Sequence, residues 1–314
     1  MKSAQMKGYG SSEMVEINQN DSIPNPSAGK VLVNVKAAGV NPVDWKIREG
    51  YMRQVMQLRF PSTLGMDFSG IIKEKGEGVL NFNQGDEVYG QASIASGGSG
   101  AFSEMALANA DTIAHKPNTL SHEEAAGLPL VGVSAWQALV ETIGLSNSQK
   151  ILIHGGAGGI GSVAIQLAKH LGAHVATTVS TNDKQFAKEL GADEVIDYKT
   201  QTFEEVLPHD YDAVFDTVGG DTYMRSFKVL KRGGSSIIVS MLEQPNQELM
   251  DRFDVKSTFQ FTQVNRERLT RLAEWVDQNN IHVNIDRTFR LDETAKALDY
   301  QKDVHPRGKV VLAI

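Results

Sequence analysis

The pattern of apolar and polar positions changes near residue 122. Before it, strand candidates follow one another, the apolar and β-branched Val31–Val35 and then Gly70–Lys75 and Glu87–Tyr89. Gly, Pro, Asn and Asp separate them, which is typical of strands joined by turns. From Ser121 onward, helical and strand patterns alternate. The first of these helices is predicted by Ser121-His122-Glu123-Glu124, which has the form of a helix-capping box. The chain therefore predicts a β-rich part followed by an α/β part.

Six short apolar runs in the second part predict the strands of one parallel sheet. They are Ile151–His154, His174–Val179, Glu194–Ile196, Ala213–Asp216, Ser236–Ser240 and Ser257–Phe261. Helical patterns lie between most of them, and each link is long enough for the right-handed crossover that parallel strands need. We therefore expect a doubly wound Rossmann sheet in the order 3-2-1-4-5-6, with its ligand at the carboxyl ends of the strands.

The last apolar run, Lys309–Ile314, has no place in a complete sheet of this kind. We expect it to return to the β-rich part, which would then be discontinuous. The expected domains are a β-rich domain of residues 1–122 and 266–314 and a dinucleotide-binding domain of residues 123–265.

The first strand of the predicted sheet runs into a glycine-rich turn and then into a helical pattern. Gly156, Gly158 and Gly161 satisfy the spacing G-x-G-x-x-G, and Gly159 and Ile160 complete the turn. Glycines let the backbone turn tightly and approach a pyrophosphate, whose charge is met by N–H groups at the helix N-terminus. Because strand, turn, helix and a second strand follow in this order, we expect these residues to bind a dinucleotide.

Composition narrows the class of protein. With 314 residues, 41% hydrophobic content and a net charge of −7, the chain can bury a sizeable core and has no basic run that would predict nucleic-acid binding. No apolar stretch approaches the roughly 20 residues of a membrane helix, and the start lacks the apolar core of a signal peptide, so we expect a cytoplasmic protein. The absence of cysteine excludes a disulfide, a thiol nucleophile and a cysteine-ligated zinc.

Several motifs together carry a family resemblance. They are Ala38–Asp44, Gly65–Gly70, Gly85–Gly90, Leu128–Gly132, the glycine-rich turn, Leu190–Asp193 and Arg307–Leu312. With its β-rich front, central glycine motif and short return, the chain resembles the medium-chain dehydrogenase/reductase superfamily. It is most similar there to the zinc-independent quinone oxidoreductases and the alkenal (enone) reductases. The resemblance implies a GroES-like catalytic domain beside the Rossmann domain, and commonly a homodimer joined through the edge of the cofactor sheet, here Ser257–Phe261.

Two neighbouring classes do not fit. Where the zinc-using branch has a cysteine ligand this chain has the Asn41–Asp44 region, and where that branch has a histidine ligand it has Met66. Catalytic zinc needs about three protein ligands, so we expect no metal. A short-chain dehydrogenase would carry its glycine motif near the N-terminus together with Y-x-x-x-K, and none of the seven tyrosines is followed by lysine at that spacing.

The end of the second strand indicates which cofactor binds. An NAD-binding domain usually has an acidic residue there, which accepts hydrogen bonds from the adenosine ribose. This chain instead has Ser180 and Thr181, with Lys184 shortly after. Hydroxyls and an ammonium suit a 2′-phosphate. The resemblance implies that the lysine and Tyr198 hold this phosphate. Asp183 has two interpretations: it begins the next helix, or it binds the ribose. Because the end of the second strand itself is not acidic, we expect the cofactor to be NADPH.

Other candidates come mainly from the resemblance. It places Asn41 at the nicotinamide end of the cleft, although Asn41 and Asp44 also suit plain turn chemistry. Lys46 and Tyr51 are nearby groups that could donate a proton to a substrate, or could simply be exposed polar residues. Ser134 stands where the family often has a threonine near the cofactor.

Two further positions follow the fourth strand. Val218 and Gly219 come directly after the strand that ends in Asp216 and should pass close to the nicotinamide ribose. His154 ends the first strand, and we expect it to be packed and hydrogen-bonded rather than catalytic.

The expected function is transfer of hydride from NADPH to a quinone or an α,β-unsaturated carbonyl compound. Without zinc no Lewis acid polarises an unactivated ketone, while conjugated acceptors spread the developing negative charge. The alternative is a non-catalytic NADPH-binding protein, either a redox sensor or a structural protein.

Overall fold

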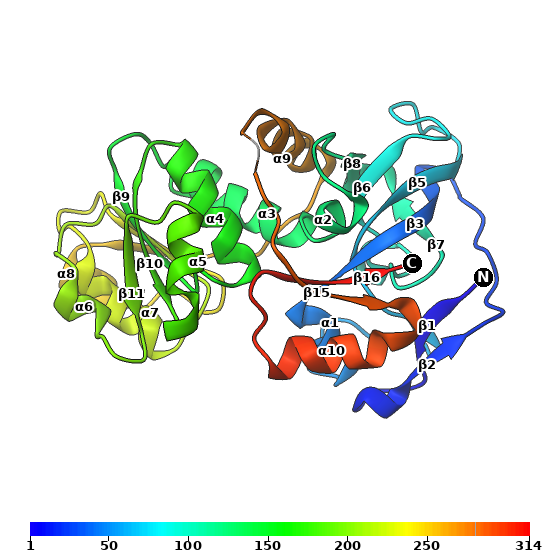
Figure 1. The fold of residues 1–314 in the computed structure, drawn as a ribbon, viewed down its shortest axis with the longest axis horizontal. Coiled ribbons are helices and arrows are strands. Elements are labelled where there is room, and N and C mark those ends of the chain that lie inside the picture. Colours follow the sequence, from blue (N-terminus) through cyan, green and yellow to red (C-terminus); the bar gives the residue numbers. More distant parts are fainter. Residues whose placement is uncertain (280) are drawn as a thin grey trace. The chain divides into compact units, whose positions relative to one another are not determined.

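The computed structural model describes residues 1–279 and 281–314, which divide into two compact units (Figure 1). Unit 1 comprises Met1–Leu130 and Val264–Ile314, and unit 2 comprises Val131–Gln263. The sequence analysis divided the chain after residues 122 and 265. The helix α2 (His122–Ala126) therefore lies in unit 1, because its buried Ala126 packs with Ala37 and Val311 of that unit's sheet.

Unit 1 is built on two sheets. The larger contains β3 (Lys30–Val40), β5 (Asp67–Lys75), β6 (Glu87–Gln91), β7 (Met105–Asn109), β8 (Ile113–His115), β15 (Ile285–Arg290) and β16 (Lys309–Ala313). Its order is β15-β16-β3-β5-β6-β8, with β7 also paired with β3. The smaller sheet contains β1 (Ser3–Met6), β2 (Val15–Asn18) and β4 (Ser62–Thr63), in the order β2-β1-β4.

The final strand returns to this unit. Strand β16 runs antiparallel to β3, with Val310 opposite Val40 and Ala313 opposite Ala37. Figure 1 shows this C-terminal strand, in red, beside the blue β3. The prediction that Lys309–Ile314 rejoins the β-rich part is confirmed.

Four helices of the described chain belong to unit 1 alone. They are α1 (Pro42–Arg48), α2, α9 (Arg266–Asn279) and α10 (Thr294–Asp303). The capping box predicted for α2 is present, because the Glu124 N–H donates to Ser121 Oγ at 3.2 Å and the Ser121 N–H donates to Glu124 Oε2 at 2.9 Å. A hydrogen bond of this kind satisfies N–H groups that a helix start leaves unpaired.

Unit 2 contains the predicted parallel sheet. Its strands are β9 (Lys150–His154), β10 (His174–Val179), β11 (Glu194–Asp197), β12 (Ala213–Asp216), β13 (Ile237–Ser240) and β14 (Lys256–Phe259). Every pairing is parallel, in the order β11-β10-β9-β12-β13-β14. This is the order 3-2-1-4-5-6, and the predicted fold class is confirmed.

Helix α3 (Pro129–Trp136) begins in unit 1, continues as a π-helical turn at Gln137–Thr142 and precedes the first strand. The helices that lie between successive strands are α4 (Gly159–His170), α5 (Lys184–Glu189), α6 (Phe203–Val206), α7 (Asp221–Ser226) and α8 (Gln247–Phe253). Helix α4 buries Val163, Ala164 and Leu167 where it packs on β9 and β10. The central strands β9, β12 and β13 are mostly apolar and buried because the middle of a parallel sheet is covered on both faces.

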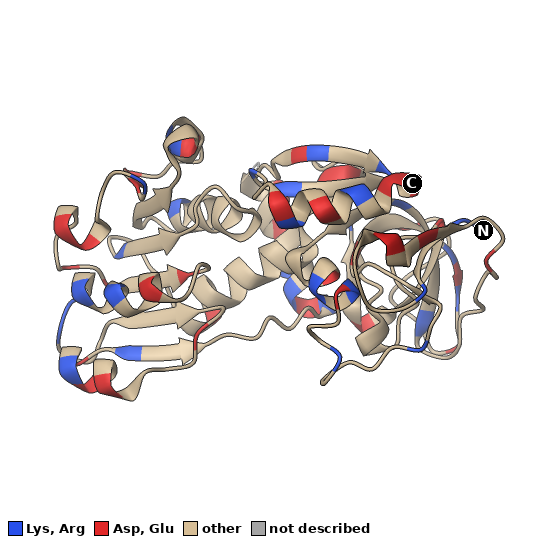
Figure 2. Ribbon diagram, turned by 90° about the horizontal axis from the view of Figure 1, so that it is seen from below, with Lys and Arg blue, Asp and Glu red and all other residues tan. Residues whose placement is uncertain are grey.

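Charged residues of both signs are interspersed along the helices and loops in the ribbon of Figure 2. Many form pairs, such as Lys302 with Glu49 at 2.7 Å. Within the described chain, no helix combines the length and the apolar character that crossing a membrane requires.

Candidate cofactor site and a buried polar cluster

The glycine-rich turn lies between β9 and α4, as predicted. Gly155 has a positive φ of 74°, and the N–H of Gly156 donates to the Thr178 carbonyl at 3.1 Å, which holds the turn against β10. Helix α4 begins at Gly159, directly after the extended Gly158. The first N–H groups of a helix have no partner inside it, so those of Gly159, Ile160 and Gly161 are suited to an anion.

The three glycines of the motif have different reasons to be glycine. A Cβ at Gly156 would lie 2.1 Å from Thr177 Oγ1, and one at Gly161 would lie 2.2 Å from the Gly155 carbonyl oxygen. Packing inside unit 2 alone requires glycine at both positions. At Gly158 the nearest atom would be 3.4 Å away, an ordinary contact. Packing therefore does not require glycine at this third position.

The predicted 2′-phosphate residues lie together at the carboxyl ends of β10 and β11. Ser180 and Thr181 follow β10, and Lys184 begins α5. The Tyr198 N–H donates to the Val179 carbonyl at 3.1 Å, which brings the end of β11 to the same place. Thr181, Lys184 and Tyr198 are all exposed.

Two carboxylates accompany this group. Asp183 stands immediately before α5, in the helix-start position that was one of its two interpretations, and accepts a hydrogen bond from Ser180 Oγ at 2.5 Å. Burial opposes ionisation of Asp197, but hydrogen bonds from Thr181 and the Lys199 N–H and the charge of Lys184 lower its pKa. The charge of Lys184 is therefore partly balanced already in the free protein.

The other side of the cradle is formed by the loop after β12. The N–H groups of Val218 and Gly219 both donate to Asp216 Oδ1 at 3.0 Å. Gly219 has a positive φ of 77° and is buried, whereas Val218 is exposed. Both predicted residues thus lie on a loop of fixed conformation at the carboxyl edge of the sheet.

Ser134 is buried in α3, where its hydroxyl bonds to that of Thr262 at 2.7 Å. Its carbonyl accepts a hydrogen bond from Gln260 Nε2 at 2.9 Å. Ser134 therefore ties α3 to the segment that follows β14.

His154 is packed and hydrogen-bonded, as expected. Its ring contacts Thr178 Oγ1 at 3.0 Å and Ser226 Oγ at 2.9 Å, and the Ser226 hydroxyl donates to the Thr222 carbonyl. Burial lowers the pKa of His154 to about 4, although Asp216 nearby raises it. The ring is neutral at physiological pH and links β9, β10 and α7.

In unit 1, Asn41 lies at the start of α1 and belongs to a buried polar cluster that the sequence analysis did not predict. Asn41 Nδ2 donates to Asp67 Oδ2 at 2.9 Å, and Asn41 Oδ1 accepts from the ammonium of Lys309. Asp44 closes the helix start by accepting from the Asn41 N–H at 2.7 Å. Asp67 Oδ1 also accepts from Gln91 Nε2. Both ends of the Asn41 amide are bonded inside unit 1, so the residue links the start of α1 to β5 and β16. Its implied place at the nicotinamide end of the cleft stays a prediction.

The cluster holds two carboxylates and one ammonium away from water. Burial raises the pKa of Asp44 to about 7, even though the hydrogen bond from the Asn41 N–H opposes the shift. Burial also raises the pKa of Asp67 and lowers that of Lys309, against their mutual attraction. Asp44 Oδ1 has no hydrogen-bond partner in the described chain, so only one oxygen of this buried carboxyl is stabilised by a donor.

Lys46 and Tyr51 lie close together at the other end of α1. The Lys46 ammonium lies 5.6 Å from the centre of the Trp45 ring, and the Tyr51 ring meets Trp45 edge-on at 6.0 Å. Tyr51 is 71% exposed. Neither side chain is buried, so both are accessible to a ligand.

The donor set does not fit zinc. Within residues 1–279 and 281–314, no three His, Cys, Asp or Glu side chains gather as metal ligands. At the positions of the zinc ligands, the Asn41 amide is bonded to Asp67 and Lys309, and Met66 offers only a thioether, which suits softer metals.

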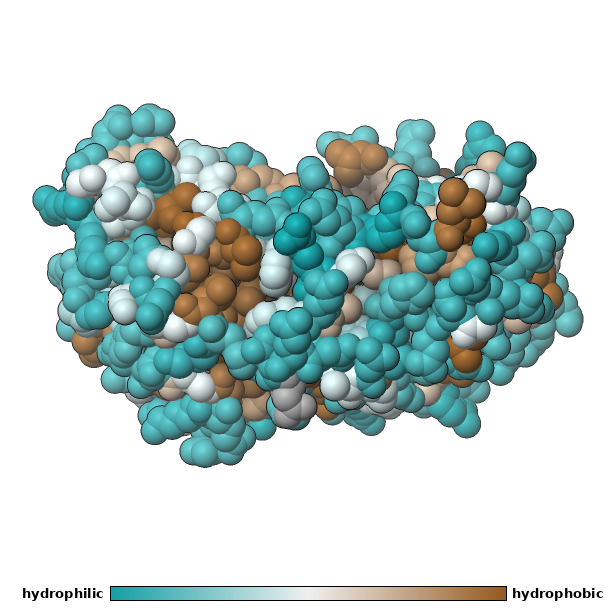
Figure 3. Space-filling view, turned by 90° about the horizontal axis from the view of Figure 1, so that it is seen from above, coloured by the Kyte–Doolittle hydropathy of each residue, from teal (hydrophilic) through white to brown (hydrophobic). Residues whose placement is uncertain are grey.

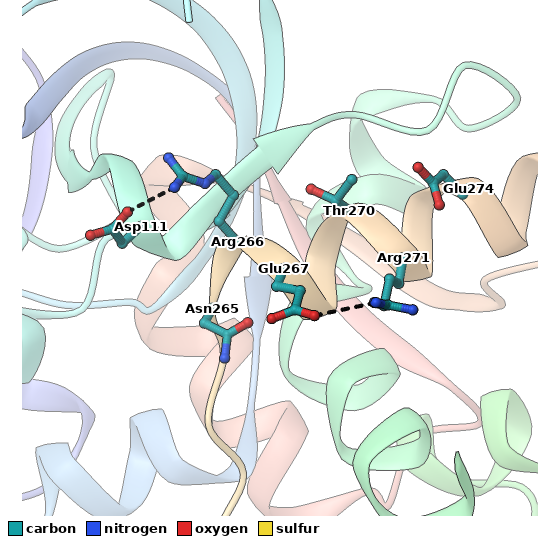
Figure 4. A pocket seen from close by; sticks show the side chains of 7 residues that line it. All are labelled: Asp111, Asn265, Arg266, Glu267, Thr270, Arg271 and Glu274. Carbon is teal, nitrogen blue, oxygen red and sulfur yellow. Dashed lines mark ion pairs between the residues drawn. The ribbon is translucent and has the colours of Figure 1, made fainter. Parts of the chain in front are cut away.

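A surface hollow of about 630 Å³ lies along α9 in unit 1 (Figure 4). The charges that line it are largely paired with one another, Arg266 with Asp111 and Arg271 with Glu267, each at 3.4 Å. None of its residues is a predicted site residue, and we assign it no function.

The chain matches two family models, the alcohol dehydrogenase GroES-like domain over residues 27–118 and the zinc-binding dehydrogenase over residues 190–312. It is 35% identical over 320 residues to a 2-methylene-furan-3-one reductase of Solanum lycopersicum, covering 99% of this chain and 79% of that one. It is 33% identical over 320 residues to an NADPH-dependent alkenal/one oxidoreductase of Arabidopsis thaliana, named as chloroplastic, with the same coverage.

Solved structures with the same fold include two quinone oxidoreductases. That of Coxiella burnetii has a TM-score of 0.89 and 34% identity, over 100% of this chain and 99% of the other. That of Escherichia coli, in complex with NADPH, has a TM-score of 0.88 and 26% identity over all of both chains.

The raised pKa of Asp44 makes the stability of the protein depend on pH. The unfolded carboxyl titrates near pH 3.9, so its contribution to stability is full below that pH and is lost as pH rises through about 7. Asp44→Asn, which mimics the protonated acid, should therefore stabilise the protein relative to wild type by roughly 2–3 kcal/mol more at pH 8 than at pH 5. Denaturant unfolding at both pH values measures this difference.

Asp303→Asn, on the exposed end of α10, is the control and should leave the difference between the two pH values unchanged. Equal effects of Asp44→Asn at pH 5 and pH 8 would show that Asp44 does not titrate in this range.

Proposed function

Because the chain belongs to the medium-chain dehydrogenase/reductase family, we propose that the protein is an NADPH-dependent oxidoreductase that transfers hydride to quinones or α,β-unsaturated carbonyl compounds. The observation that carries this proposal is the end of β10, where two hydroxyls and an ammonium stand in place of the acid that NAD requires. The named activities of the relatives, on alkenals and quinones, agree with it.

The residues of unit 2 suit the parts of NADPH in order along the sheet edge. The N–H groups of Gly159, Ile160 and Gly161 would meet the pyrophosphate, and Gly158 leaves room for it. Ser180, Thr181, Lys184 and Tyr198 would hold the 2′-phosphate. We propose that Val218 and Gly219 border the nicotinamide ribose.

When bound, NADPH supplies a hydride to the electrophilic carbon of the acceptor. The protein orients the reactants and offers a donor to the oxygen on which negative charge develops. Lys46 and Tyr51 are the candidates for that donor, because both carry a proton and are not buried. Asn41 holds the start of α1, on which Lys46 lies, and would border the nicotinamide end of the cleft.

No step of this proposal uses a metal. Conjugated acceptors delocalise the charge that a Lewis acid would otherwise stabilise, so quinones and enones are the acceptors best matched to this donor set. A cytoplasmic location stays a prediction, since the Arabidopsis thaliana relative is named as chloroplastic.

We also propose a homodimer joined through β14. This strand ends the order of the parallel sheet in unit 2, so one side of it has backbone groups without a neighbouring strand. Its sequence, Lys256–Phe259, is β-prone and contains no proline, a pattern that invites pairing. Apolar side chains also gather on one face of unit 2 (Figure 3), and Phe261, just after β14, is 71% exposed.

The proposed activity predicts that the protein oxidises NADPH with benzoquinone or a conjugated enone and much more slowly with the saturated ketone of the same size. Absorbance of NADPH measures the rate, and exhaustive chelation should leave it unchanged. Loss of activity on chelation, restored by zinc, would contradict metal independence. Tight NADPH binding without turnover of any acceptor would favour the non-catalytic alternative.

Lys184 should discriminate between the two nicotinamide cofactors. A charged hydrogen bond is worth ~1.5–3 kcal/mol, so Lys184→Ala should raise the Kd for NADPH by about tenfold or more and leave that for NADH nearly unchanged. Lys188→Ala, an exposed lysine on the same helix, is the matched control. Equal weakening of both cofactors would remove Lys184 from the phosphate site.

The dimer is tested by light scattering, because the chain has a mass of 34.2 kDa. A dimer at micromolar concentration is expected, and Phe259→Lys should weaken it by placing a charge in the paired edge. A monomer mass for the wild type would exclude the dimer, and an undisturbed dimer of the variant would move the interface elsewhere.

A further inference from the structure

Two loops at the carboxyl edge of the sheet in unit 2 are held by one buried carboxylate. Asp216 ends β12 and is fully buried. Its Oδ1 accepts the two N–H groups of the loop after β12, from Val218 and Gly219, and its Oδ2 accepts the hydroxyl of Ser240 at 2.9 Å. A buried carboxylate with three donors fixes the backbone strongly, because any change leaves a charge without its partners.

Ser240 and Glu243 extend this arrangement to the loop after β13. Ser240 Oγ accepts the N–H groups of Leu242 and Glu243, at 3.3 and 3.1 Å. Glu243 Oε1 accepts the Gly220 N–H at 2.8 Å, which joins the two loops a second time. Neither loop can move without breaking bonds to the other.

The same loops are joined to the glycine cradle. Thr217 Oγ1 donates to the His154 carbonyl at 2.8 Å. A Cβ at Gly155 would lie 2.7 Å from Thr217 Oγ1, so the side chain packs against the turn. The cradle and the loops after β12 and β13 are therefore one continuous hydrogen-bonded surface.

Two apolar side chains are exposed on this surface. Val218 is 49% exposed and Leu242 is 52% exposed. They come from neighbouring loops, since a Cβ at Gly219 would lie 3.0 Å from that of Leu242. Charged residues would be the usual choice for a solvent-facing loop, so this pair suits a flat, uncharged ligand group.

The strand order indicates which ligand group lies here. The hydroxyls and Lys184 that suit the 2′-phosphate follow β10, on one side of β9, and β12 and β13 lie on the other side. A dinucleotide with its pyrophosphate at the cradle extends to both sides, so its nicotinamide half faces the loops after β12 and β13.

We propose that Asp216 is a positioning residue for the nicotinamide half of the cofactor, and that Leu242 binds that half together with Val218. The inference rests on the proposed function, because it takes NADPH as the ligand. Asp216 acts through the loops and does not itself contact the cofactor.

The test compares two ligands on the isolated full-length protein. One is oxidised NADP, and the other is the adenosine bisphosphate fragment of the cofactor, which keeps the 2′-phosphate but lacks the nicotinamide half. Titration calorimetry gives both Kd values without turnover. Leu242→Ser and Asp216→Asn should each raise the Kd for NADP by about tenfold. Because the fragment binds away from these loops, its Kd should stay within about twofold of wild type.

Two matched variants show what a merely structural effect looks like. Asp212→Asn alters a carboxylate at the opposite end of the same loop-and-strand segment, where it accepts the Lys150 N–H and pairs with Lys231. Val206→Ser alters an apolar residue of α6 that is equally exposed, at 49%. Both should leave the ratio of the two Kd values unchanged.

If Asp216→Asn does not fold, Glu243→Ala, which removes the acceptor of the Gly220 N–H, takes its place. If the variants lose affinity for both ligands equally, or if Leu242→Ser keeps the wild-type Kd for NADP, the inference is overturned. Both outcomes presuppose that the wild type binds NADP. Failure of wild type to bind either ligand would instead overturn the proposed function.

Discussion

The polar interior of unit 1 depends on a single buried ammonium group. Lys309 is 4% exposed, and it lies among Asn41, Asp44 and Asp67, none of which reaches water. Removing charges from water costs several kcal/mol per ion, and that cost is offset only while the opposite charge and the hydrogen bonds are present. Without the ammonium, two acids would face each other in an apolar surrounding and the start of α1 would lose its anchor.

Unit 2 attracts an anion without a buried charged side chain. Its cradle contains no cationic side chain, and its attraction for an anion comes from N–H groups at the start of α4, which close packing at Gly156 and Gly161 brings into place. The fixed dipoles of the cradle need no counter-ion when empty, whereas the charge of Lys184 already interacts with Asp197 in the free protein. Binding of a phosphate must therefore compete with this carboxylate.

The sheet of unit 2 could be predicted from the sequence because most of its strands are local apolar or β-prone runs and the chirality of the crossovers limits their order. The cradle could also be predicted from local sequence, since its glycines lie within seven residues of one another. The cluster around Asn41 could not. Lys309 lies 268 residues from Asn41 along the chain, and nothing near Asn41 indicates that a lysine will be its partner. The resemblance marked the motifs around Asp67 and Lys309 but gave neither residue a role. Similarly, the sequence shows Asp216 only as a polar residue at the end of a strand. The three hydrogen bonds that it accepts in the structure show that it holds two loops.

The return of the chain to unit 1 has a consequence for how the protein is made. Strand β16 inserts between β15 and β3, and it brings Lys309 to the cluster. On the ribosome, β3, α1 and β5 emerge long before Lys309, and all of unit 2 is synthesised in between. All strands of the unit 2 sheet have been synthesised once β14 has left the ribosome, so unit 2 can fold before Lys309 is available to the acids of unit 1. During that interval Asp44 and Asp67 have no buried counter-ion, so burying them is unfavourable until the last strand brings Lys309 to the cluster.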